Sequence, residues 1–356
     1  TSLFSSIHWR DTLTHHPLNA PFILVGHALL LVRHDSLLMM RLTATLFGLL
    51  TLSVFYWLTR HWYGERTAVL GTVLFGTSAW FLHTARLGTP DVLLFGLLCL
   101  TACGVWLKHS TKPLPVILAL VLAAVFLYIP GMMWFIGAGV VWQWKTIDRA
   151  FKKHLWMVTL GGFLVLAALA PLAWALYHDP AFAKELAGLP AVGWPQPFTV
   201  IRNLLDVPVQ LLWRGPLWPE HWLGELAVLN ALCIGALFLG VYVHAKHLRL
   251  ARTQLLLILL LAGAALVALG GGVSLSVVVP FIFILVAAGA GFLLDRWYVV
   301  FPRNTIAQGV GLGLVSLAVL ASAWYGFRHY FVAWPEAPET KSTFLVQLAP
   351  SDTIHK

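Results

Sequence analysis

The chain consists largely of apolar runs of about 20 residues separated by short polar loops. A helix needs about 20 apolar residues to cross the hydrocarbon core of a bilayer, where every backbone polar group must be bonded internally. Runs suited to this role cover residues 42–59, 67–85, 91–107, 154–177, 225–244, 254–270, 275–294 and 305–327. The stretch 114–144 allows two further short spans, with a turn or kink at Tyr128-Ile129-Pro130-Gly131. The pattern predicts an all-α, polytopic transmembrane helical bundle of about ten spans.

The composition supports a membrane protein. Hydrophobic residues make up 59% of the chain and charged residues 10%, whereas about a quarter of an ordinary globular domain is charged. This balance excludes a soluble enzyme, a disordered chain or a nucleic-acid-binding domain for the bulk of the sequence. The three cysteines lie inside apolar runs, without the spacing of a disulfide framework or a metal site.

The distribution of Lys and Arg predicts the orientation in the membrane, because cytoplasmic loops carry the excess of positive charge. Loops 60–66, 108–112, 145–153, 246–252 and 295–303 hold 13 of the 23 basic residues and three of the 14 acids. With these loops inside, the 86–91 turn, the 178–224 loop and the C-terminal tail lie outside. The net charge of +9 then needs no nucleic-acid partner.

Three regions follow from this topology. Residues 1–35 form an outer loop and an interfacial helix, because the apolar stretch 17–32 has sixteen residues and includes Asn19 and His27. Residues 36–327 form the transmembrane bundle, and 328–356 form a short extracytoplasmic tail. Since residue 1 is Thr and no apolar leader opens the chain, at least one further helix is expected upstream.

The outer loop 178–224 is expected to be ordered and to contribute to function. It contains seven prolines and four tryptophans, which favour a structured segment at the membrane interface. The chain has no convincing internal repeat, which argues against a transporter built from inverted halves.

Polar groups predicted on the outer side are the candidate site residues. Asp11 precedes His15 and His16, and a carboxylate beside imidazoles is either a general base with phosphate-binding partners or part of a solvated loop. Asp91, at the mouth of a span and five residues after Arg86, is either functional or an ordinary first-turn acid. Arg41 either reaches the lipid headgroups or binds a phosphate.

A second outer group combines aromatic and charged side chains. Arg214 opens the string Arg-Gly-Pro-Leu-Trp-Pro-Glu-His-Trp, which includes Glu220 and His221, and Tyr128 lies at another outer turn. These residues either bind acceptor or donor, or belong to the aromatic belt of the interface. The chain has no Walker A, HExxH or GxSxG motif, so NTP hydrolysis, zinc proteolysis and serine hydrolysis have no support.

The order of these motifs resembles the GT-C membrane glycosyltransferases, especially relatives of the protein O-mannosyltransferases and the lipid A aminoarabinose transferases. The resemblance covers about residues 13–110 and rests on His16-Pro17-Leu18, Arg41-Leu-Thr-Ala-Thr-Leu-Phe-Gly-Leu-Leu-Thr, Arg60-His-Trp-Tyr-Gly-Glu-Arg-Thr-Ala and Phe81-Leu-His-Thr-Ala-Arg86 followed by Asp91. It implies inverting transfer of a sugar from a polyprenyl-phosphate sugar to an extracytoplasmic acceptor, and a GT-C-type bundle with interfacial helices on the outer face.

The resemblance also implies roles for individual residues. His16, Arg41 and Arg86 would surround the donor phosphate together with His15 and Arg214, and Asp91 would orient the acceptor or a cation. The family places an acid in its first outer loop, where this sequence offers Asp11. The base is then Asp11 or an acid upstream of residue 1. The third possibility is that the protein is not a transferase.

The expected partners are the polyprenyl-phosphate sugar donor, a protein, lipid or glycan acceptor, and membrane lipids. No cofactor is predicted, although a divalent cation is left open. A non-catalytic polyprenyl-lipid-binding or transport protein, for which Gly270-Gly271-Gly272 is the best feature, and a degenerate GT-C subunit are the alternatives. The absence of outer-loop disulfides and the compact loops favour the cell membrane of a bacterium.

Overall fold

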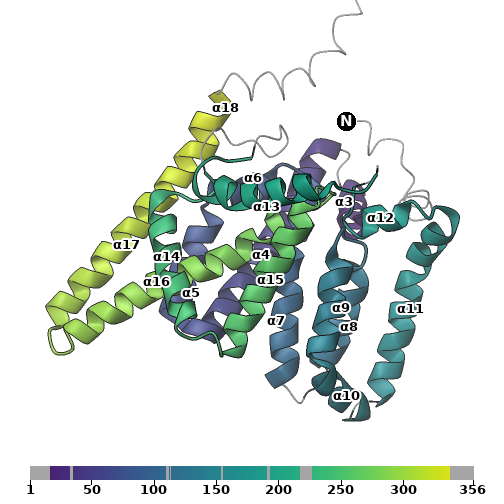
Figure 1. Ribbon diagram of the computed structural model, residues 1–356, viewed down its shortest axis with the longest axis horizontal. Coiled ribbons are helices and arrows are strands. Elements are labelled where there is room, and N and C mark those ends of the chain that lie inside the picture. The colour runs from purple at the N-terminus through teal and green to yellow at the C-terminus, as the bar shows by residue number, and fades with distance from the viewer. Residues whose placement is uncertain are drawn as a thin grey trace, which may run out of the picture. The chain divides into compact units, whose positions relative to one another are not determined.

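The computed structural model of the protein describes residues 17–32, 35–109, 112, 114–153, 155–190, 193–216 and 227–336. Every regular element in these ranges is helical, which confirms the all-α class. Figure 1 shows them: α3 (Ala20–Leu30), α4 (Ser36–Tyr63), α5 (Glu65–Gly76), α6 (Ala79–Arg86), η1 (Pro90–Phe95), α7 (Gly96–His109), α8 (Leu114–Phe126), α9 (Met132–Trp142), α10 (Trp144–Lys153), α11 (Leu155–His178), α12 (Phe182–Leu186), α13 (Pro197–Leu212), α14 (Ala231–Ala245), α15 (Ala251–Ala268), η3 (Leu275–Val277), α16 (Val279–Val300), α17 (Thr305–Arg328), the π-helix η4 (His329–Ala333) and α18 (Trp334–Glu336).

Six of the described helical segments are long and apolar enough to cross a membrane, as expected of a multi-pass membrane protein. They are Leu37–Tyr63, Pro90–His109, Val158–His178, Ala251–Ala268, Val279–Val300 and Thr305–Glu336. The pair α5 and α6 would make a seventh. The other apolar helices, α3, α8, α9 and α14, are shorter, so the predicted number of about ten spans stays a prediction.

The predicted span 67–85 is broken in its middle. α5 and α6 meet at 63°, with Thr77 and Ser78 between them. The Thr77 hydroxyl donates to the Val73 carbonyl (2.6 Å) and the Ser78 hydroxyl donates to the Phe75 carbonyl (2.7 Å). The same carbonyls also accept the backbone N–H groups of Thr77 (3.0 Å) and Ser78 (3.1 Å), so these are second bonds that satisfy the hydroxyls within an apolar segment. Bonds of this kind often accompany a bend in a helix.

The chain divides into two compact units, and the first comprises described residues of 17–58, 84–204 and 251–281. Figure 1 shows α7, α8, α9 and α11 side by side in this unit, with α10 at one end and α3 and α12 at the other. α3 also packs on α4, because the rings of Phe22 and Phe47 stack with centroids 6.4 Å apart. The positions of α3 and α12 in a membrane remain predictions.

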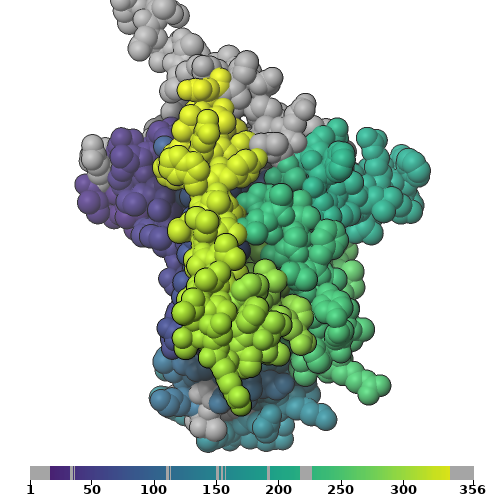
Figure 2. All heavy atoms as spheres, turned by 90° about the vertical axis from the view of Figure 1, so that its left-hand side faces the viewer, coloured from purple at the N-terminus to yellow at the C-terminus, as the bar shows by residue number. Residues whose placement is uncertain are grey.

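The second unit comprises described residues of 59–83, 205–250 and 282–336. α14 and α16 meet backbone to backbone there: a Cβ on Gly240 would overlap the Leu285 carbonyl oxygen, and one on Gly289 would overlap that of Ala236. α17 packs against α5 and follows α16 through a short turn. Figure 2 shows α17 in yellow along an open face of the molecule.

We expect Gly240→Ala to destabilise the protein, because the added methyl group would push α16 away from α14. Overpacking of this kind costs about 1–3 kcal/mol. The matched control is Gly235→Ala in the same helix, where nothing lies within 4 Å of the new Cβ. Alanine favours a helix over glycine by up to about 1 kcal/mol, so this control should be neutral or stabilising. Thermal unfolding in one detergent compares the two, and equal melting temperatures would contradict the contact.

Candidate functional site

The predicted pair Arg86 and Asp91 lies on a tight turn between α6 and η1. Thr89 precedes a proline, which disfavours helical backbone, and it is extended at φ −98° and ψ 155°. Gly88 has φ +79°, a conformation that L side chains rarely adopt. Asp91 lies in the first turn of η1, where a carboxylate is favoured by the unpaired backbone N–H groups. The turn therefore holds both charged residues at its two ends, five positions apart in the sequence.

The same turn packs against the beginning of α4. A Cβ on Gly88 would lie 3.3 Å from the Arg41 nitrogen and 3.3 Å from the Met40 carbonyl carbon. The Thr45 hydroxyl lies 2.8 Å from the Arg41 carbonyl and 3.2 Å from the Ala85 carbonyl, so it shares its proton between the two helices. Arg41, which precedes the turn by more than 40 residues, thus joins Arg86 and Asp91 at one corner of the first unit.

This corner, defined by Arg41, Arg86 and Asp91, has the charges that a phosphate-linked reaction uses. Both arginines are exposed and Asp91 is half-buried. A guanidinium binds phosphate oxygens through paired hydrogen bonds, and a carboxylate can orient a hydroxyl or accept its proton. The backbone contact of the Gly88 turn with α4 thus brings three of the predicted residues into one part of the first unit.

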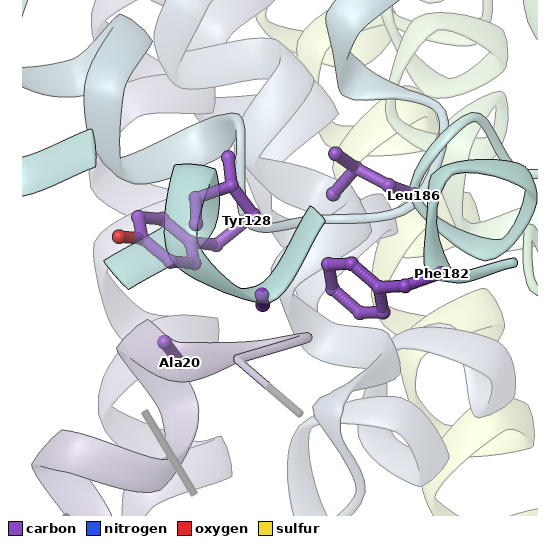
Figure 3. Close-up of a cluster of buried hydrophobic side chains, with 6 residues drawn as sticks. Ala20, Tyr128, Phe182 and Leu186 are labelled. Atoms are coloured by element: carbon purple, nitrogen blue, oxygen red, sulfur yellow. The ribbon is translucent and has the colours of Figure 1, made fainter. Parts of the chain in front are cut away.

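Tyr128 is part of a packing cluster at the α8–α9 turn (Figure 3). It is 6% exposed, and its hydroxyl donates to the Ala168 carbonyl of α11. Its own carbonyl accepts from the Asn19 N–H (2.8 Å). Figure 3 shows Phe182 and Leu186 of α12 close to Tyr128 and Ala20. In this setting the side chain joins α3, α11 and α12 to the turn, and its predicted binding role remains a prediction.

The remaining predicted site residues belong to the second unit or lie outside the described part of the chain. Arg214 belongs to the second unit, where it is exposed just beyond the end of α13 and its N–H donates to the Val209 carbonyl (2.9 Å). The following predicted residues lie outside the described part of the chain: Asp11, His15, His16, Glu220 and His221. Within the described ranges, no group of three or more His, Cys, Asp or Glu side chains could hold a metal ion.

A pocket in the second unit is a feature that the sequence interpretation missed. It has a volume of about 600 Å³ and lies between the α5–α6 break, the start of α14 and the C-terminal part of α17. The signal available in the sequence was the series of small residues on α17, Ala318, Ala321, Ser322 and Gly326, at helical spacing.

Comparison of the chain with protein-family models, curated proteins and solved structures found no match.

We expect Gly88→Ala to loosen the beginning of α4. The matched control is Gly64→Ala, because Gly64 also has positive φ (+90°) but has nothing within 4 Å of an added Cβ. Both variants place an L side chain at positive φ, which costs about 1–3 kcal/mol, and only Gly88→Ala adds the contact with Arg41. Hydrogen exchange of the amides of residues 39–45 should accelerate in Gly88→Ala alone. Equal exchange in the two variants would show that the turn does not support α4.

Proposed function

We propose that this protein is an integral-membrane glycosyltransferase of the GT-C type, transferring a sugar with inversion from a polyprenyl-phosphate sugar to an extracytoplasmic acceptor. The observation that carries the proposal is the contact of Gly88 with α4, which groups Arg41 with Arg86 and Asp91. The order of motifs in residues 13–110 supports the same class.

In the proposed reaction the acceptor hydroxyl attacks the anomeric carbon as the bond from that carbon to the phosphate oxygen breaks. The leaving polyprenyl phosphate gains negative charge, which Arg41 and Arg86 stabilise. A carboxylate, for which Asp11 is the candidate in this sequence, accepts the proton of the acceptor hydroxyl, while half-buried Asp91 orients the acceptor or a cation. Attack from the face opposite the phosphate inverts the anomeric configuration.

A second candidate is a protein that binds or moves polyprenyl lipids without chemistry. The bent pair α5 and α6 favours it, because broken helices line the sites of many transporters. The glycine run 270–272 favours it less than the sequence suggested. A Cβ on Gly271 would overlap the Gly188 carbonyl oxygen, and Gly188 in turn approaches Gly131. Close packing of the α15–η3 connection in the first unit therefore accounts for the glycine at this position.

We expect Arg41→Gln to weaken donor binding by about 10- to 100-fold, because a hydrogen bond to a charged group contributes about 1.5–3 kcal/mol. The matched control is Arg60→Gln on the same helix, an exposed arginine that pairs with Glu65 at 3.3 Å. Binding of a polyprenyl-phosphate sugar to the purified protein measures the difference. Equal affinity of the two variants would remove Arg41 from the phosphate site.

We expect Asp91→Asn to lower the transfer rate by at least about tenfold with a smaller effect on donor binding, because a neutral amide does not orient the acceptor hydroxyl as a carboxylate does. Asp148→Asn is the control, since this acid pairs with Lys152 (2.7 Å) on α10. Release of polyprenyl phosphate is the readout. Full activity of Asp91→Asn would exclude its role, and donor binding without turnover in the wild-type chain would favour the second candidate.

A further inference from the structure

The pocket of the second unit is lined by residues that lie far apart in the sequence. Trp80 and Phe283 form its buried wall, and each is 1% exposed. Trp213, which is 84% exposed, and Tyr325, which is 48% exposed, line it at the surface. The cavity therefore runs from a buried aromatic wall to an open aromatic rim.

Polar and small residues fix the packing of α14 and α17 at the pocket. Asn230 caps α14 by accepting from the Cys233 N–H (2.9 Å), and its amide donates to the Ser322 hydroxyl of α17 (2.5 Å). Close to this bond, Gly326 allows α17 to contact the Thr77 carbonyl. The small side chain of Ala321 leaves room between these two fixed points. The space is thus a consequence of the packing of α14 and α17.

The lining is suited to a hydrocarbon chain. The amide and hydroxyl groups of Asn230 and Ser322 already bond to each other, and most other lining residues are apolar. α17 is long enough to span a membrane, and its exposed Leu317 and Leu320 face the surroundings of the protein. A pocket of about 600 Å³ is within the range of small-molecule sites and would be reached from the lipid phase.

The charges close to the rim favour an anionic headgroup. Arg214 follows the rim residue Trp213, and Arg328 precedes the lining residue His329; both arginines are exposed. Glu336 is the nearest acid along the same helical segment, seven residues beyond His329. An acyl chain that moves from the bilayer into an apolar pocket changes little in hydration. Selectivity for one lipid over another must therefore come from the headgroup and from close packing.

We propose that this pocket binds one acyl chain of an anionic phospholipid from the surrounding bilayer, with the headgroup phosphate beside Arg214 and Arg328. The lining residues belong to the second unit, whereas Arg41, Arg86 and Asp91 belong to the first. Its occupancy by a lipid would fill the space between α14 and α17.

Photocross-linking in lipid nanodiscs tests the proposal with the full chain. The nanodiscs contain phosphatidylcholine and a trace of phosphatidylglycerol that carries a diazirine on one acyl chain. We expect adducts on the lining residues of α14 and α17. Unlabelled phosphatidylglycerol should compete at least about tenfold better than added phosphatidylcholine, as expected for two arginines at a membrane surface. Equal competition by the two phospholipids would overturn the proposed headgroup preference.

Two adjacent substitutions test the position of the chain. Ala321→Trp fills the pocket, whereas Leu320→Trp places the same ring at a site that is 63% exposed and does not line it. We expect at least a fivefold loss of adducts in Ala321→Trp and no loss in Leu320→Trp, with melting temperatures compared for both. The double variant Arg214→Gln, Arg328→Gln, which leaves the pocket interior intact, should abolish the preference for phosphatidylglycerol. Unchanged labelling of Ala321→Trp, an unchanged preference in the double variant, or displacement by polyprenyl phosphate but not by phosphatidylglycerol, would each contradict the proposal.

Discussion

Close contact between backbones at glycine is the interaction on which both units of this protein depend. Lipid chains are as apolar as leucine side chains, so burial from water does not drive membrane helices together. Dispersion contacts and hydrogen bonds must do so, and they require close approach. Gly240 and Gly289 give α14 and α16 this approach, and Gly326 does the same for α17 at Thr77. Each of these glycines faces a carbonyl oxygen, and a methyl group at any of them would separate the two segments.

The candidate site and the pocket both result from close backbone contacts at glycine. Gly88 lets a charged turn lie on the backbone of α4, so residues from two helices share one corner. In the second unit, a close contact at Gly326 lies next to the small side chains of Ala321 and Ser322, and this alternation leaves the cavity. On one helix, the close backbone contact at Gly326 therefore positions a neighbouring element, whereas the small side chains leave space for a ligand.

The sequence predicted the helices well and their contacts poorly. Runs such as 42–59 and 305–327 coincide with α4 and α17, because length and apolarity are local properties of a span. The bend at Thr77 was not predicted, since hydroxyl bonds to preceding carbonyls leave no distinct pattern in an apolar run. Tyr128 was placed among outer polar groups, but the structure buries it against residues 40 or more positions away in α11 and α12. Such packing depends on partners that a single chain does not reveal.

The helical segment Thr305–Glu336 has a further consequence for how the protein meets its membrane. Its 32 residues extend about 48 Å, whereas the hydrocarbon core is about 30 Å thick. In its apolar window of 18 residues only 11% of residues are buried in the protein, so most of this window is exposed on the surface. A helical segment longer than the hydrocarbon core can tilt, or its polar end, here the His329–Ala333 π-helix with Arg328 before it, can project into the headgroup layer. Bilayer thickness thereby becomes a variable that sets how far the His329–Ala333 π-helix extends beyond the hydrocarbon core.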